Sequence, residues 1–108
     1  MKIYVDDMRI APVGWVRFTS AENLIEALPT LPTPIEDVSF DHDLGEPTTH
    51  KSGYDLVKYL VNEEPNFFDT VNTVAVHSSN TVGRKNMLTY LTNAQTHGII
   101  NSDMKIIL

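Results

Sequence analysis

The sequence contains no cysteine among its 108 residues, which excludes disulfide frameworks, thiolate metal sites and cysteine nucleophiles. Basic residues are also scarce, because eight Lys and Arg stand against fourteen Asp and Glu, for a formal net charge of −6. That balance argues against general nucleic-acid binding, since affinity for a phosphate backbone requires a basic face. No apolar run approaches the roughly 18 residues of a membrane span, and Asp6 and Asp7 come too early for a secretory leader. We therefore expect a cytoplasmic protein with no membrane partner.

The length bounds the architecture. A chain of this size can bury one core but not two, so residues 1–108 are expected to form a single domain. Short apolar runs rich in β-branched residues alternate with stretches of helical period. The predicted strands are 2–6, 15–19, 38–41, 71–76 and 104–108, and the predicted helices are 20–28, 52–64 and 82–96. This alternation predicts an α/β domain with a mostly parallel sheet, whose ligands bind beyond the carboxyl ends of the strands.

Acidic residues follow two of these strands. Asp6 and Asp7 end the first, Asp41 ends the third, and Asp43 lies just behind it. If the two strands are parallel neighbours, the carboxylates meet at one edge of the sheet and repel each other unless a cation lies among them. Oxygen ligands of this kind suit Mg²⁺, or Mn²⁺ in its place. The alternative is that the acids only cap turns and solvate the edge.

The end of the fourth strand is typical of an anion site. Ser78, Ser79 and Asn80 can present polar donors just before a helix N-terminus, where free N–H groups favour negative charge. Arg84 and Lys85 follow in the first helical turn, where cations oppose the helix dipole. That placement indicates a bound phosphate. The alternative is an ordinary Ser/Asn cap followed by a solvated basic turn.

Two histidines lie at the same strand ends. His77 follows the fourth strand directly and is a candidate general acid or base, or a donor to phosphate. His42 lies between two acids, which favours its protonated form. The alternative for each ring is a structural hydrogen-bonding group, and the residues alone leave both interpretations open.

Three blocks of sequence carry a resemblance. They are Asp6–Arg9 (DDMR), Phe40–Gly45 (FDHDLG) and His77–Met87 (HSSNTVGRKNM). Their order and spacing resemble the receiver domain of two-component response regulators, and in particular the cyclic-phosphate processing receiver domain, a branch frequent in phages. The resemblance implies a flavodoxin-like five-stranded sheet in the order 2-1-3-4-5, with helices on both faces, the first helix reduced and the last absent. For a phage protein the compartment is the host cytoplasm.

The short segment between the first two strands departs from ordinary receivers. Asp7 to Gly14 replace a full helix there, and parallel crossovers normally need a dozen or more residues. Either this link is extended or the second strand is not parallel.

The resemblance also implies roles for single residues. Asp6 and Asp7 match metal-binding acids, and Asp41 matches the phospho-acceptor position. Ser78, or alternatively His77, matches the residue that contacts the phosphate. The remaining candidates for phosphate binding in the matched blocks are Arg9, His42, Ser79, Asn80, Arg84 and Lys85, and the metal set is Asp6, Asp7, Asp41 and Asp43.

Three functions are consistent with these residues. The first is a metal-dependent phosphoesterase acting on a small cyclic phosphate derived from a nucleotide or from ADP-ribose, with His77 as general acid and Asp41 as metal ligand or nucleophile. The second is a signalling receiver phosphorylated on Asp41. The third is a non-catalytic protein that sequesters a nucleotide signal. The first and third share a small phosphorylated ligand as their partner.

Overall fold

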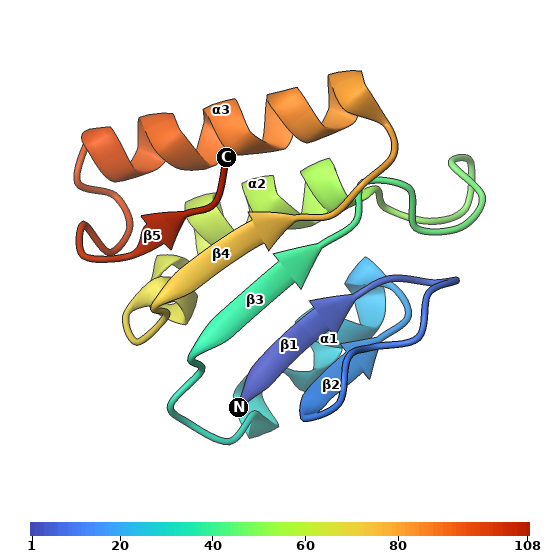
Figure 1. The fold of residues 1–108 in the computed structure, drawn as a ribbon, viewed down its shortest axis with the longest axis horizontal. Coiled ribbons are helices and arrows are strands. Elements are labelled where there is room, and N and C mark those ends of the chain that lie inside the picture. Colours follow the sequence, from blue (N-terminus) through green and yellow to red (C-terminus); the bar gives the residue numbers. More distant parts are fainter.

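The computed structural model describes residues 1–108, in which two strands come first and helices and strands then alternate (Figure 1). Short 3₁₀ turns follow the first two helices, at Leu28–Thr30 and Pro65–Phe68. None of the helices has the length and apolar character needed to cross a bilayer. The strands are β1 (Lys2–Val5), β2 (Trp15–Phe18), β3 (Asp37–Phe40), β4 (Thr73–Val76) and β5 (Lys105–Ile106), and the helices are α1 (Ala21–Ala27), α2 (Gly53–Glu63) and α3 (Thr81–Thr96).

The sheet has the predicted flavodoxin-like order, β2-β1-β3-β4-β5, and every neighbouring pair is parallel. The prediction of an α/β receiver-like fold is therefore confirmed. The question of the second strand is also answered, because β2 runs parallel to β1 although no helix joins them. The link contains bends and a turn but no helix, and the amide of Asp6 bonds to the carbonyl of Phe18 just beyond the paired strands.

Side-chain caps mark the starts of the helices. Ser20 accepts a hydrogen bond from the third residue of α1, and Asn80 does the same for α3. At α2, Ser52 and Asp55 form a reciprocal capping box. Each cap satisfies amides that have no partner within the helix. The capping residues therefore fix the starts of the three helices in the segments that follow β2, β3 and β4.

The core lies between the sheet and the three helices. Inward residues of β1, β3 and β4 are buried, including Ile3, Val38 and Val74. Figure 1 shows α1 and α2 behind the sheet and α3 beside α2. The prediction of helices on both faces is wrong. Right-handed crossovers that run in one direction along a sheet put their helices on one face, and the single connection in the opposite direction, from β1 to β2, contains no helix.

Candidate functional site

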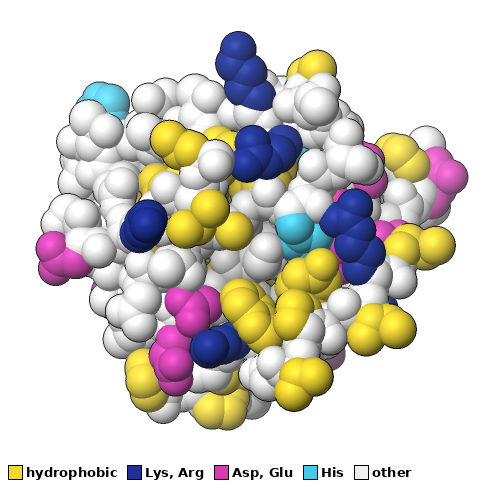
Figure 2. Space-filling view, in the orientation of Figure 1, with side chains coloured by type: hydrophobic (Ala, Val, Ile, Leu, Met, Phe, Trp, Pro, Cys, Tyr) yellow, Lys and Arg dark blue, Asp and Glu magenta, His cyan; other side chains and the backbone are white.

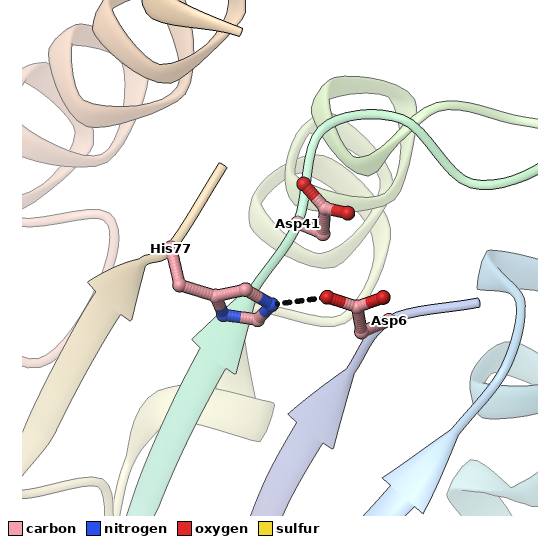
Figure 3. A group of neighbouring side chains, drawn as sticks. All are labelled: Asp6, Asp41 and His77. Atoms are coloured by element: carbon pink, nitrogen blue, oxygen red, sulfur yellow. Dashed lines mark hydrogen bonds and ion pairs between the residues drawn. The ribbon is translucent and has the colours of Figure 1, made fainter. Parts of the chain in front are cut away.

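The carboxyl ends of β1, β3 and β4 bring together three side chains that are far apart in the sequence. Figure 3 shows the side chains of Asp6 and His77 facing each other at the ends of their strands, with the carboxylate of Asp41 beside them. One potential ligand atom from each lies within 4.8 Å of the others. The convergence expected from the parallel sheet is therefore present.

Asp6 is the buried anchor of this group. Its side chain is fully inaccessible, and Oδ1 accepts hydrogen bonds of 2.8 Å from the amides of Met8 and Arg9. Oδ2 lies 2.9 Å from Nε2 of His77. Burial raises the pKa of Asp6, but the hydrogen bonds from Arg9, Met8 and His77 outweigh it and lower the pKa below its usual value. Asp6 is thus held as a carboxylate in one orientation.

Both ring nitrogens of His77 have partners. An ionised carboxylate only accepts, so Nε2 donates to Asp6, and Nδ1 lies 2.7 Å from the hydroxyl of Ser39. The imidazole also stacks on the ring of Tyr4, with centroids 4.2 Å apart and planes 3° from parallel. His77 is therefore fixed by the sheet and by Asp6, and neither nitrogen is free to face a ligand.

Ser39 is not among the site residues predicted from the sequence, because it lies within the third strand and the prediction considers only the polar residues at the strand ends. Its position two residues before Asp41 was the available signal, since alternate residues of a strand share a face. Ser39 is buried and bonded to His77, so it belongs to the support of the site.

An open polar cavity of about 360 Å³ lies beside this group. The carboxylates of Asp7 and Asp41 form no ion pair with any Lys, Arg or His of the chain, and Asp41 Oδ1 accepts only the amide of His42, at 2.9 Å. Uncompensated acids that line one cavity favour the binding of a cation. The cavity is lined by Asp6, Asp7, Met8, Arg9, Asp41, Asp43, Gly45 and Ser79.

Two glycines allow the loops to close around the cavity. A side chain on Gly53, the first residue of α2, would overlap the backbone carbonyl of Asp41, and one on Gly83 would overlap the ring of His42. Because glycine has no side chain, α2 and α3 can start directly against the loop after β3. That contact sets the position of Asp41.

A second cluster borders the cavity on the α3 side. The ring of His42 lies 2.8 Å from the carboxylate of Asp43 through Nδ1, and the side-chain amide of Asn80 donates to the same oxygen at 3.4 Å. The hydrogen bond from His42, with that from Asn80, lowers the pKa of Asp43. Asn80 also caps α3 through Gly83, and Ser78 accepts the amide of Asn80. His42, Ser78 and Asn80 thus have structural partners, whereas Ser79 lines the cavity.

The basic residues are arranged differently from the prediction. Nε of Arg84 donates to the carbonyl of Val76 at 3.1 Å, and Arg84 and Lys85 line a separate groove of about 470 Å³ between α3 and Leu108. The cation that lines the acidic cavity is Arg9, whose guanidinium donates to the carbonyl of His77 and lies 4.0 Å from Asp6. The structure therefore does not bring Arg84 and Lys85 to the cavity.

Comparison with known families gives one match. The family model described as the cyclic-phosphate processing Receiver domain matches residues 1–93. That range contains every residue of the cavity and of its support. No curated protein and no solved structure gave a significant match.

Proposed function

Since the chain belongs to the cyclic-phosphate processing receiver family, we propose that it is a phosphoesterase that uses a divalent metal to open a small cyclic phosphate. The observation that carries the proposal is the cavity in which the unpaired carboxylates of Asp7 and Asp41 lie beside the immobilised Asp6. The ligand would be a cyclic phosphate derived from a nucleotide or from ADP-ribose.

The donor set fits a hard divalent cation. Its free donors are carboxylate oxygens, which suit Mg²⁺ or Mn²⁺. Asp7 and Asp41 would hold the ion, with Asp43 within the same cavity and Asp6 contributing its fixed negative charge. When bound, such an ion polarises a phosphoryl oxygen and lowers the pKa of bound water.

The chain's own groups then have separable tasks. Arg9 is the cationic side chain of the cavity, so it neutralises charge that develops on the phosphate, and the hydroxyl of Ser79 can donate to a phosphoryl oxygen. His77 has both nitrogens engaged, so we assign it the orientation of Asp6 in place of proton donation to the leaving oxygen. Phosphoryl transfer relies chiefly on such positioning and electrostatics.

The reaction balances with water as the only co-reactant. The oxygen of water bonds to phosphorus, one ring P–O bond breaks, and the departing ribose oxygen takes up a proton released from the water. The product is an open phosphate monoester with one more negative charge near neutral pH than the cyclic diester, which is the charge that Arg9 faces.

Phosphorus NMR tests the proposal. Wild-type protein with Mg²⁺ is expected to convert the signal of ADP-ribose cyclic phosphate or of a cyclic nucleotide to that of a monoester, and chelation of the metal to stop the conversion. Asp41→Asn should abolish turnover. Asp103→Asn, which changes an exposed acid in the loop before β5 and outside the cavity, should leave it intact. Absence of turnover on all these compounds by folded wild type would reject the proposal.

Two further measurements separate the other candidate functions. Binding of a cyclic phosphate that is recovered unchanged would favour a sequestering protein. Stable labelling by acetyl phosphate that is lost in Asp41→Asn would favour a signalling receiver, since the side chain of Asp41 is partly accessible in the cavity.

A further inference from the structure

The face of the sheet opposite the helices is open, and it continues directly from the cavity. In Figure 1 this face is turned toward the reader, and no helix lies over β1 or β3. Strand register places two rows of side chains on it. The first row is Trp15, Lys2, Asp37, Thr73 and Lys105, and the second is Arg17, Tyr4, Ser39 and Ala75. The next positions along β1, β3 and β4 are Asp6, Asp41 and His77.

This open face is basic although the chain as a whole is acidic. Its rows hold the cations Lys2, Arg17 and Lys105 and one acid, Asp37, which lies 3.9 Å from Lys2. Arg17 and Lys105 form no ion pair, and Arg17 donates only to the carbonyl of Arg9. Figure 2 shows Lys and Arg side chains distributed around a hydrophobic centre of this face. The charge complements an anionic ligand.

Two aromatic side chains connect the open face to the site. Tyr4 stacks on His77 on one side, and on the other it meets Trp15 edge to face, with ring centroids 6.2 Å apart and planes at 83°. Trp15 is partly exposed; Tyr4 is the one ring that contacts it, and Nζ of Lys2 lies 6.0 Å from the centroid of the indole. An indole held in this way offers a surface on which a planar base can stack.

We infer that the open face binds the nucleoside part of the ligand, an inference that rests on the proposed function. The base would lie on Trp15 and the further phosphates near Arg17 and Lys2. Trp15 pairs with Lys2, four residues before Asp6 along β1, so the base would lie roughly 13 Å from the cavity at about 3.3 Å per residue. A nucleoside diphosphate joined to a second sugar can bridge this separation. The substrate class is therefore a dinucleotide-like cyclic phosphate rather than a bare sugar phosphate.

The test compares two probes on one protein. They are ADP-ribose cyclic phosphate, which carries a base and a diphosphate, and ribose cyclic phosphate, which carries neither. We expect kcat/KM for the first to exceed that for the second by about tenfold or more in wild type, within the range that base–aromatic stacking supplies. In Trp15→Leu the ratio should fall by about fivefold or more, because the base loses its stacking partner while Arg17 and Lys2 remain. Tyr59→Leu, a change to a partly exposed aromatic of α2, should keep the wild-type ratio.

Fluorescence gives a second measurement that does not depend on turnover. Because Trp15 is the single tryptophan, its emission should be quenched by ADP-ribose cyclic phosphate and not by ribose cyclic phosphate, also in the Asp41→Asn variant. Equal kcat/KM for both probes in wild type, or an unchanged ratio in Trp15→Leu, would overturn the inference and leave the proposed function standing. Failure of wild type to bind or process either probe would overturn both. A dimer that Trp15→Leu dissociates, seen by sedimentation, would show that a second copy occupies the face and would also overturn it.

Discussion

Removal of the Asp6 carboxylate should destabilise the protein even when no divalent ion is present. Asp6 is fully buried and accepts hydrogen bonds from the amides of Met8 and Arg9 and from the ring of His77. Asp6→Ala leaves these three donors without their acceptor. The prediction therefore concerns the folded scaffold of the site and is independent of catalysis.

The size of the effect follows from those three hydrogen bonds. A buried donor left without a partner costs roughly 1–3 kcal/mol, and water can reach the two amides because Met8 and Arg9 are exposed. We expect the free energy of unfolding of Asp6→Ala to fall by about 3 kcal/mol in total. For a domain of this size the melting temperature should then fall by about 15 °C.

Urea denaturation in the presence of a chelator, followed by Trp15 fluorescence and by circular dichroism, measures this loss. Asp7→Ala is the matched control, since Asp7 is the next residue and no hydrogen bond involves its side chain. The control should stay within about 0.5 kcal/mol of wild type. A loss below about 1 kcal/mol in Asp6→Ala, or equal losses in both variants, would refute the structural role assigned to Asp6.

Further predictions concern the helix starts. Gly53→Ala should destabilise the fold by about 1–3 kcal/mol despite the better helix propensity of alanine, because the new Cβ overlaps the carbonyl of Asp41; a stabilised Gly53→Ala protein in thermal melts would contradict this. Asp55→Ala should cost about 1 kcal/mol through loss of the capping box with Ser52. Hydrogen bonds from Ser52 lower the pKa of Asp55 below its ordinary value of 3.8, so this contribution is present above pH 3.8 and is lost as the pH falls through the lower pKa of the folded state. A difference between wild type and Asp55→Ala that persists undiminished at pH 2 would refute the assignment.

The sequence predicts the convergence of the strand ends because the signals for it are local. Short apolar runs that end in Asp6 and Asp41, alternating with capped amphipathic helices, predict parallel strands whose carboxyl ends share one edge. The caps at Ser52 and Asn80 are equally local, and the structure contains both.

The sequence does not predict the directions in which several side chains of the site point. The spacing of Arg84 and Lys85 after the fourth strand does not specify the phase of α3, and in the structure both residues line the groove toward Leu108. The pairing of Ser39 with His77 depends on the strand register, which no short segment determines. Arg9 lines the cavity from the bend after β1, where its amide and that of Met8 bond to Asp6.

The open face could have been recognised from the alternation of β1 and β3. Lys2 and Tyr4 alternate with Ile3 and Val5, a pattern of one buried and one accessible face. The expectation of helices on both faces came from the resemblance to receiver domains and not from this pattern. The direction of the crossovers, applied to the sheet order, places every helix on one face.

A titration with Mg²⁺ followed by amide NMR tests the central claim most directly. The account predicts saturable shifts confined to the amides of residues 6–9, 40–45 and 77–80, and their loss in Asp41→Asn, because these segments surround the acidic cavity. Spectra that do not change with Mg²⁺ or with Mn²⁺, or shifts spread over acidic residues throughout the chain, would contradict a metal site at the carboxyl ends of the strands.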